Sequence, residues 1–404
     1  MENERSYIRR RIWKSRLQSL PFYLCRIFPI KNNKIVFCCI EGTTGYTCNP
    51  KYIAEELLRR NSKAGQEEQY ELVWLVNDMS KMFPKGITKV HNTLWNRAYH
   101  LTTAHIWIDN SRKQMEVRKR KGQTYIQTWH AKLGFKPTGL DRGASFTEIA
   151  YLVSKHDSDM VDYWLSNSDW YDKTLPTGSI YTGKTLRTGS PRCDILVNGR
   201  DASRRKVRNA YKLSQDAKIL MYAPTFRGGS QATDRTVETG DNFPDYQRLA
   251  KALEERIGGK WHIFLRLHPQ LVARNLDSDM TGENITDVSR VDDMYELLAG
   301  CDAFMTDYSS AAFDAAVMQI PIFLYADDYE EYEQERGKLL WDLRELPFPL
   351  AVNNDELEEQ IREFDEKSYL DKLDKLLEDT GMMEDGKAAK RVADTVKRIM
   401  LQKR

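Results

Sequence analysis

The stretch CDAFMTDYSSAAFDAAVM, residues Cys301–Met318, decides the fold that we expect for this chain. Its apolar run from Ala303 to Thr306 predicts a buried strand, and the Ala-rich part that follows Ser309 and Ser310 predicts a helix. The two serines can cap this helix, or their hydroxyls and the unpaired N–H groups beside them can bind a phosphate. The other motifs of the chain bear on which of these two roles applies.

The same alternation of strand and helix continues on both sides of this stretch. Apolar runs predict further strands at 35–40, 70–76, 105–109, 124–128, 164–166, 218–222, 261–267, 284–287 and 321–325. Strands that alternate with helices form parallel sheets, and such sheets bind ligands beyond the carboxyl ends of their strands. The loops that follow strands are therefore the places to look for functional side chains.

The chain of 404 residues is long enough for two α/β domains at about 150 residues per domain. We expect an N-terminal Rossmann-like domain over 34–197 and a C-terminal Rossmann-like domain over 198–404. Charged amphipathic helices after residue 353 should brace the second domain, and the last of them can cross back to the first. Residues 1–33 form a separate basic segment.

Composition points to a soluble globular protein, with 41% hydrophobic and 30% charged residues. We find no run of 18 apolar residues and no signal peptide, so we expect no transmembrane helix and an intracellular location. The six cysteines form no CxxC pair, which argues against a disulfide framework and against a zinc site.

The N-terminal segment has the pattern of a basic amphipathic helix. Residues 1–34 contain nine Arg or Lys and two Glu. Apolar residues recur there at helical spacing, at Ile8, Ile12, Trp13, Leu17 and Leu20. Two interpretations are open: the helix docks on anionic lipid, where each basic residue contributes on the order of 1 kcal/mol, or it packs on the protein with a solvated charged face.

Two histidines follow predicted strands directly. His130 comes after the strand at 124–128, and His268 comes after the strand at 261–267 and before Pro269. A lone histidine is usually structural, but at the ligand edge of a sheet its near-neutral pKa suits general base catalysis. Lys136 and Asp141 lie further along the loop that His130 begins.

Other strand ends carry weaker indications. Arg227 follows a strand beside glycines, and a guanidinium there can make paired hydrogen bonds to a phosphate. Gly42 also follows a strand, but its surroundings do not form a GxGxxG motif. Arg192, in the turn Gly189-Ser190-Pro191-Arg192, can face a cleft from an interdomain hinge. The DxD at Asp157-Ser158-Asp159 is not at a strand end, so we do not assign it a metal.

The basic run between Arg112 and Lys121 has two interpretations as well. Such a run is commonly a solvated face, and the alternative is a basic surface that gathers a polyanionic acceptor. We do not expect nucleic-acid binding, because no recognised binding motif accompanies the basic stretches. The oligomeric state is not predicted by the sequence.

Taken together, these motifs resemble the CDP-glycerol glycerophosphotransferase family, whose members prime and polymerise teichoic acids and related polymers. The resemblance runs from about Phe28 to Val352. The motifs that carry it are Asn49-Pro50-Lys51, Gln127-Thr128-Trp129-His130, Gly189-Ser190-Pro191-Arg192-Cys193-Asp194, Tyr222-Ala223-Pro224-Thr225-Phe226-Arg227, Leu267-His268-Pro269 and Thr306-Asp307-Tyr308-Ser309-Ser310 with Asp314. One departure is Ala131, where the family usually has Gly, and it leaves the acceptor open.

The resemblance implies a glycosyltransferase-B architecture, in which two Rossmann-like domains face a cleft that holds the active site. The two functional histidines of the family fall on His130 and His268. In the family's reaction an acceptor hydroxyl attacks the β-phosphorus of CDP-glycerol, or of a similar CDP-alditol, and CMP leaves. Nothing in this reaction demands a cofactor, and a divalent metal is optional.

From this resemblance we expect His130 to act as the base and His268 to hold the donor pyrophosphate, although the two roles could be exchanged. The other residues expected to bind the donor are Thr225, Arg227, Asp307, Ser309, Ser310 and Asp314. Those expected at the acceptor side or the cleft are Gly42, Lys136, Asp141 and Arg192. No residue is predicted to bind a metal.

The partners that the resemblance implies are CDP-glycerol or another CDP-alditol, a lipid-linked saccharide or polymer acceptor, and an anionic membrane surface. We expect the protein to be peripheral to the cytoplasmic face of the cell membrane. Three alternatives stay open: a CDP-ribitol ribitolphosphotransferase of the same fold, a nucleotide-sugar glycosyltransferase, and a non-catalytic binder of anionic polymers.

Overall fold

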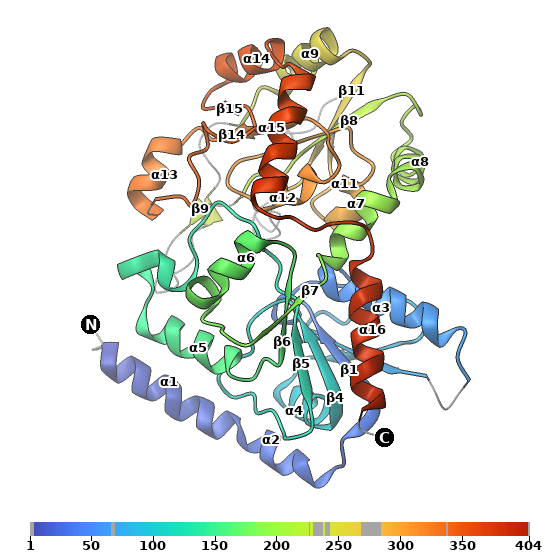
Figure 1. The fold of residues 1–404 in the computed structure, drawn as a ribbon, viewed down its shortest axis with the longest axis vertical. Helices are drawn as coiled ribbons and strands as arrows, with labels where there is room; N and C mark the ends of the chain where they lie inside the picture. The colour runs from blue at the N-terminus through green and yellow to red at the C-terminus, as the bar shows by residue number, and fades with distance from the viewer. Residues whose placement is uncertain are drawn as a thin grey trace. The chain divides into compact units, whose positions relative to one another are not determined.

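The computed structural model describes residues 4–65, 69–225, 227–228, 237–238, 243–267, 284–336 and 338–402. The chain forms two compact units, each built on its own parallel sheet (Figure 1). Unit 1 comprises Met1–Lys132, Thr138–Asp194 and Met383–Arg404, and unit 2 comprises Leu133–Pro137 and Ile195–Met382. The predicted fold class, with two parallel α/β domains, is confirmed.

The sheet of unit 1 has the strand order β3-β2-β1-β4-β5-β6-β7, and all its pairs are parallel. Its strands are β1 (Lys31–Cys38), β2 (Glu71–Val76), β3 (Ile87–His91), β4 (Ala104–Asp109), β5 (Thr124–Gln127), β6 (Tyr163–Ser166) and β7 (Lys184–Arg187). The order reverses between β1 and β4. In a doubly wound sheet this reversal is the topological switch point, where ligands bind beyond the carboxyl ends of the strands.

The main sheet of unit 2 repeats this plan, with the order β12-β11-β8-β13-β14-β15 and a switch point between β8 and β13. Its strands are β8 (Lys218–Tyr222), β11 (Trp261–Leu265), β12 (Ile285–Asp287), β13 (Ala303–Thr306), β14 (Ile322–Tyr325) and β15 (Leu350–Ala351). A short antiparallel pair, β9 (Arg227–Gly228) with β10 (Val237–Glu238), accompanies this sheet.

The predicted strands correspond to observed ones, but two outer strands of unit 1 escaped prediction. The central strands are apolar because both of their faces are buried, as in β4, whose six residues are all buried. In contrast, β3 and β7 are the edge strands of the sheet, and none of their residues is buried. An exposed edge strand lacks the apolar run by which a buried strand is recognised in a sequence.

Helices cover both faces of the sheet in unit 1. They are α1 (Glu4–Gln18), α2 (Leu20–Leu24), α3 (Cys48–Asn61), α4 (Leu94–Thr103), α5 (Glu148–Ser158), α6 (Asp169–Thr174) and α16 (Ala388–Leu401). Successive residues of a strand point to opposite faces. Accordingly Val36 and Cys38 of β1 join one core with α2 and α4, whereas Ile35 and Phe37 join a second core with α3 and α16.

The last helix, α16, belongs to unit 1, although we expected residues 198–404 to form one domain. Figure 1 shows α16 beside α3, and Val392, Val396 and Ile399 are buried in the same core as Phe37. The boundary after Asp194 lies close to the expected one. The amphipathic pattern predicted the helix, but it does not say which sheet the apolar face covers.

In unit 2, helices lie before the first strand, between strands and after the last one. They are α8 (Arg200–Ala210), α9 (Tyr246–Ile257), α11 (Met294–Leu298), α12 (Ala311–Ala316), α13 (Tyr329–Arg336), α14 (Asn354–Arg362) and α15 (Glu366–Asp379), and the short α7 (Asp194–Asn198) begins at the boundary between the units. The stretch that opened the sequence analysis forms β13, a turn and α12, as predicted. However, α12 spans only six residues.

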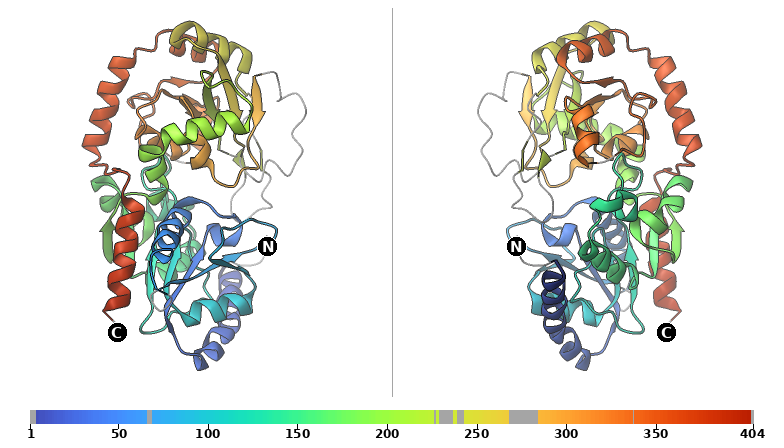
Figure 2. Two further views of the ribbon diagram at one scale, coloured as in Figure 1. Left: turned by 90° about the vertical axis from the view of Figure 1, so that its right-hand side faces the viewer. Right: turned by 90° about the vertical axis from the view of Figure 1, so that its left-hand side faces the viewer.

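The N-terminal segment is part of unit 1 and not a separate region. Figure 2 shows α1, the darkest blue helix, lying along the surface of this unit. Ile8 of α1 and Phe22 of α2 are buried, but Trp13, Leu17 and Leu20 are 64%, 54% and 56% exposed. The prediction of a single apolar face is therefore wrong: of its five residues, Ile8 is buried, Ile12 is half-buried and the other three point outward.

In the described part of the chain, no helix has the length and apolar character that a membrane crossing requires. All six cysteines are described, and each is a buried thiol outside any disulfide. The basic run is also built into the fold, because Lys113 pairs with Asp109 and Lys119 pairs with Asp162. It is therefore not the solvated basic face that the sequence suggested.

Candidate active site

Three loops of unit 1 meet at its switch point, where β1, β4 and β5 end. The N–H of Ile40, in the loop after β1, donates to Oδ1 of Asn110 at 2.8 Å. The next N–H, of Glu41, donates to Oγ of Ser111 at 2.9 Å. The N–H of Thr128, just after β5, donates to the carbonyl of Asp109 at 2.8 Å. The loops that follow these three strands are thus held together by hydrogen bonds to the residues after β4.

Strained backbone marks the same loops. Ile40, Glu41, Cys48 and Trp129 have φ values of 44°, 55°, 59° and 50°, in the left-handed region that favours glycine. Each such residue costs on the order of 1–3 kcal/mol, which the surrounding structure has to supply. Strain of this kind gathers at active sites and ligand sites. Its position here supports a functional site around the end of β5.

His130 is presented by the strained turn at Trp129, directly after β5. The ring is half-buried, and Nδ1 lies 2.7 Å from the carbonyl oxygen of Asn110. A carbonyl only accepts hydrogen bonds, so Nδ1 must carry the proton. The lone pair of a neutral ring is then on Nε2, which is the arrangement that a general base needs.

The surroundings keep this imidazole neutral near pH 7. Burial lowers the pKa of His130 below its usual 6.5, and the hydrogen bond to Asn110 opposes this effect in part. The charge of Arg192 adds to the lowering. A neutral imidazole can accept a proton from a hydroxyl, whereas an imidazolium cannot.

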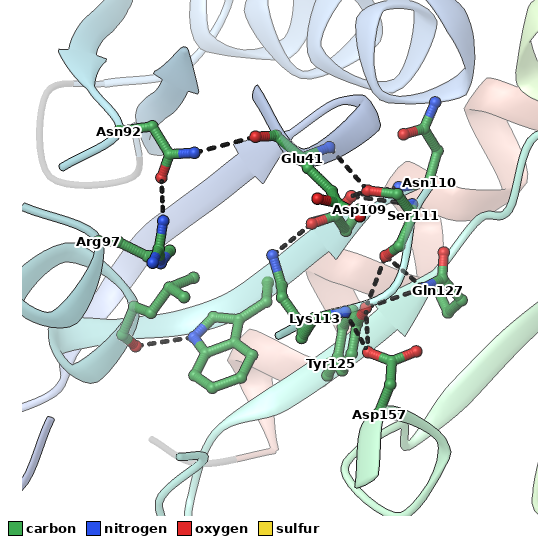
Figure 3. Close-up of polar contacts among 12 residues, drawn as sticks. Glu41, Asn92, Arg97, Asp109, Asn110, Ser111, Lys113, Tyr125, Gln127 and Asp157 are labelled. Carbon is green, nitrogen blue, oxygen red and sulfur yellow. Dashed lines mark hydrogen bonds and ion pairs between the residues drawn. The ribbon is translucent and has the colours of Figure 1, made fainter. Parts of the chain in front are cut away.

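The buried carboxylate of Asp109 shapes the turn at Asn110 and Ser111 (Figure 3). The carbonyl of Asn110 in turn holds His130. Oδ1 of Asp109 accepts hydrogen bonds from the N–H groups of Asn110 at 2.7 Å and Ser111 at 3.0 Å. Its other oxygen forms an ion pair with Lys113, and both side chains are buried. Through these contacts Asp109 fixes the carbonyl of Asn110, and that carbonyl fixes the imidazole.

A second layer of buried polar side chains supports this turn (Figure 3). Gln127 donates to the carbonyl of Ser111 at 2.9 Å, and its Oε1 accepts the N–H of Trp129 at 3.0 Å. Asp157 accepts from the Lys113 N–H at 2.8 Å, and its burial raises its pKa to about 6. The first aspartate of the DxD sequence therefore packs inside unit 1, where it binds the turn after β4.

Arg192 lies on the other side of this site, in the short turn Pro191–Cys193. Its N–H donates to Oδ1 of Asn49 at 3.0 Å, and its guanidinium lies 3.4 Å from Sγ of Cys48. Asn49 in turn donates to the carbonyl of Trp129 at 2.7 Å. A hydrogen bond from Cys39, helped by the charge of Arg192, holds the pKa of the Cys48 thiol well below its usual value.

Two other residues expected at the acceptor side have structural partners. Gly42 has a φ of 81°, and a Cβ there would come within 2.7 Å of Asn92 and 2.9 Å of Asn77. Glycine is therefore required for the close packing of this loop. Asp141 accepts a hydrogen bond from Thr177 at 3.0 Å, on the exposed surface of unit 1.

In unit 2, the residues expected to bind the donor gather at the second switch point. Thr225, after β8, donates to Asp307, after β13, from its N–H at 2.9 Å and from its hydroxyl at 2.9 Å. Asp307 is almost fully buried. The two strand ends are tied together where a doubly wound sheet binds its ligand.

The remaining donor residues differ in their surroundings. Ser309 and Ser310 are half-buried in the turn before α12, and Oγ of Ser309 accepts the N–H of Ala311 at 3.3 Å. Because α12 is so short, few peptide dipoles add up at its start. Asp314 is buried and accepts a hydrogen bond from the hydroxyl of Tyr295. Its position supports a role in holding α11 against α12.

Two predicted residues are beyond what the structure describes. His268 lies outside the described residues, and so does the side chain of Arg227, so their predicted roles stay predictions. Among the described residues, no group of three or more His, Cys, Asp or Glu is placed to hold a metal ion. The optional metal likewise stays a prediction.

Several functional residues were missed by sequence reasoning. Asp109, Asn110 and Ser111 form the turn beneath His130, and they stand directly after a buried strand in the sequence. The rule that singled out His130 could have singled out these three as well. Cys48 could not have been found in this way, because its contact with Arg192 joins distant parts of the chain.

A comparison with models of protein families identifies a family for this chain. Residues 21–398 match the model of the family described as CDP-glycerol:poly(glycerophosphate) glycerophosphotransferase. The chain belongs to this family. The match covers both sheets of this chain, whose switch points carry His130 and Thr225.

Two individual relatives are similar to most of this chain. A teichoic acid glycerol-phosphate transferase of Staphylococcus aureus is 28% identical over 391 residues, which cover 93% of this chain and 95% of the relative. A teichoic acid poly(glycerol phosphate) polymerase of Bacillus subtilis is 26% identical over 362 residues, 86% of this chain and 46% of the relative. The chain therefore spans about half the length of that polymerase.

A solved structure gives the same assignment of fold. The wall teichoic acid polymerase TagF superimposes with a TM-score of 0.81 and 25% identity, and 98% of each chain is covered. A TagF variant soaked with CDPG gives a TM-score of 0.79 at 24% identity. The likeness covers both units of this chain.

Proposed function

We propose that the protein transfers glycerol phosphate from CDP-glycerol to a hydroxyl group of a membrane-linked acceptor and releases CMP, in the synthesis of teichoic acid or a related cell-surface polymer. The family match over residues 21–398 supports this reaction class. The observation that carries the proposal is the imidazole of His130, which is fixed through Nδ1 and offers Nε2 as a base at a switch point.

The proposed step is an in-line displacement at phosphorus. The acceptor oxygen forms a bond to the β-phosphorus of the donor, and the bond from this phosphorus to the bridging oxygen breaks. The electron pair of that bond stays on CMP, and the proton of the acceptor hydroxyl passes to His130. Alignment and charge stabilisation supply most of the catalysis in such a reaction.

In this scheme unit 1 supplies the base and unit 2 supplies the donor site. Thr225 and Asp307 connect the strand ends of unit 2, and the half-buried hydroxyls of Ser309 and Ser310 stand beside them. His268 and Arg227 are predicted to complete the donor site. We propose that no cofactor is required and that a divalent metal is optional.

The products test this function directly. The purified full chain is incubated with CDP-glycerol, CDP-ribitol or a nucleotide sugar, together with a lipid-linked acceptor, and mass spectrometry identifies both products. We expect CMP and an acceptor that is longer by glycerol phosphate, and we expect turnover to persist in EDTA. Release of CDP or UDP would instead indicate a sugar transferase, and a preference for CDP-ribitol would indicate the ribitol enzyme.

We further propose that the protein is peripheral to the cytoplasmic face of the cell membrane and that α1 and α2 form its docking surface. Trp13, Leu17 and Leu20 are exposed on the side of the helices that does not pack on unit 1. Arg9 and Arg16 are exposed on the same helix. Exposed aromatic and aliphatic side chains among cations suit the interface of an anionic bilayer.

Replacing Trp13 and Leu17 together by serine should lower binding to anionic vesicles at least tenfold without changing the fold, because both side chains are exposed. The measurement is co-sedimentation with vesicles of phosphatidylglycerol and phosphatidylcholine. Leu401→Ser is the control, because Leu401 is 55% exposed on α16. Equal sedimentation of the double variant and this control would rule out docking through α1.

A further inference from the structure

The segment that follows His130 leaves unit 1 and becomes part of unit 2. Residues Leu133–Pro137 group with unit 2, although the chain on both sides of them belongs to unit 1. The sequence placed Lys136 of this segment at the acceptor side or the cleft. Its surroundings in the structure lead to a different assignment.

Apolar packing and two hydrogen bonds hold the segment in unit 2. Phe135 is fully buried, and its ring centroid lies 4.8 Å from that of Phe313 in α12. The carbonyl of Phe135 accepts the N–H of Leu340 at 2.8 Å, and the carbonyl of Gly134 accepts Nε1 of Trp341 at 3.1 Å. The burial of Phe135 and the hydrogen bonds to the carbonyls of Gly134 and Phe135 fix the segment in unit 2.

This anchoring delivers the ammonium group of Lys136 to the second switch point. Nζ lies 3.5 Å from Oγ1 of Thr225, whose hydroxyl donates to Asp307. It also lies 5.9 Å and 5.5 Å from the ring centroids of Tyr308 and Tyr332, which stack on each other at 3.9 Å. The cation is thus among residues that follow β8 and β13, at the ligand edge of the sheet.

A cation in this place has an evident electrostatic use. The bond that breaks in the proposed reaction leaves one additional negative charge on the CMP phosphate. A positive group held beside the departing phosphate stabilises that charge more in the transition state than in the ground state. Lys136 is held in position by its neighbours, so little reorganisation is needed when the charge develops.

We propose that Lys136 binds the diphosphate of the nucleotide donor and neutralises the departing CMP, and that it does not bind the acceptor. This proposal rests on the proposed function for its substrate class. It also means that one loop carries the base for the incoming hydroxyl, His130, and the cation for the leaving group, six residues further along the chain.

Lys136→Met in the full chain is the test, with Lys136→Arg as the charge-conserving variant. The control is Lys372→Met, because Lys372 is an exposed lysine of α15 in the same unit. We expect Lys136→Met to lose roughly tenfold to a hundredfold in affinity for CDP, since a charged hydrogen-bond partner is removed. Affinity for cytidine, which has no phosphate, should stay the same.

Steady-state kinetics should separate the two sides of the reaction. With Lys136→Met the KM for CDP-glycerol should rise and kcat should fall, while the KM for the acceptor stays within about twofold. Lys136→Arg should recover part of both losses. A rise in the acceptor KM alone, or unchanged affinity for CDP, would overturn the proposal.

Failure of the proposed function gives a different result from failure of this inference. If the wild-type chain releases no CMP from any CDP-alditol, the proposed function fails, whatever Lys136 does. If the wild type turns over and Lys136→Met matches Lys372→Met in CDP affinity and kinetics, the inference alone fails. If Lys136→Met does not fold, as judged by circular dichroism, Lys136→Gln is measured in the same way.

Discussion

Replacing His130 with alanine is expected to lower kcat for CMP release by roughly 10²–10⁴, the contribution of a well-placed general base. The base is lost while the donor site of unit 2 is untouched, so the KM for CDP-glycerol should change by about twofold or less. His130→Asn tests the same point with less disturbance, because its amide can still donate to the carbonyl of Asn110. Both variants should fold normally.

The control for this experiment is His91→Ala, which removes an exposed imidazole at the end of β3. It should leave both kinetic constants unchanged. CMP release by His130→Ala at close to the wild-type rate would remove His130 as the base. It would then favour the exchanged assignment, in which His268 takes the proton.

The dependence of the rate on pH follows from the same residue. Burial lowers the pKa of His130 below 6.5, and a base works only when it is unprotonated. The acidic limb of kcat/KM should therefore have its midpoint below pH 6.5. Activity should be lost as the pH falls through this midpoint. A midpoint above pH 6.5, or no acidic limb in the wild type, would contradict this prediction.

Asp109→Ala should be the most destabilising single substitution around the site. It leaves the buried ammonium group of Lys113 without its carboxylate, which typically costs 3–5 kcal/mol in free energy of unfolding. For a unit of this size that cost lowers the melting temperature by roughly 6–20 °C. It also releases the N–H groups of Asn110 and Ser111, so the imidazole of His130 loses its fixed position.

A matched pair on the surface provides the control. Lys155 and Asp159 have the same spacing in the sequence as Lys113 and Asp109, but their side chains are 47% and 59% exposed. Asp159→Ala should cost about 1 kcal/mol or less, since exposed ion pairs contribute little. Calorimetry or urea unfolding measures both effects. Equal losses in free energy of unfolding for the two substitutions would show that the buried ion pair contributes no more to stability than the exposed one.

A double substitution distinguishes a positioning role from a purely structural one. Asp109→Asn with Lys113→Gln removes both charges and keeps groups that can bond to each other and to the turn. We expect it to recover most of the stability that Asp109→Ala loses. It should also recover kcat if Asp109 acts through the orientation of His130. Recovered stability without recovered kcat would assign Asp109 a direct electrostatic role.

The sequence predicted what depends on local patterns. Buried apolar runs located the central strands, and the position after a strand singled out His130 and the stretch around Asp307. The edge strands β3 and β7 lacked such runs because solvent covers them. The positions after strands therefore indicated candidate site residues, whereas apolar runs located only the buried strands of the sheet.

What the sequence did not predict depends on long-range contacts and on orientation. Helical spacing identified α1, but it grouped Ile8 with Trp13, which the structure separates into a buried and an exposed side. The contact of Arg192 with Cys48 joins residues 144 positions apart, and no local pattern encodes it. Lys136 was assigned to the acceptor side for the same reason, since its neighbours come from unit 2.

The return of α16 to unit 1 has a consequence for biosynthesis. One face of the sheet in unit 1 is completed by Val392, Val396 and Ile399, which the ribosome makes only after all of Ile195–Met382. At about 5–20 residues per second, translation of that stretch takes on the order of 10–40 s. During this interval the core around Phe37 lacks the side chains of α16, so we expect unit 2 to fold before unit 1 is complete.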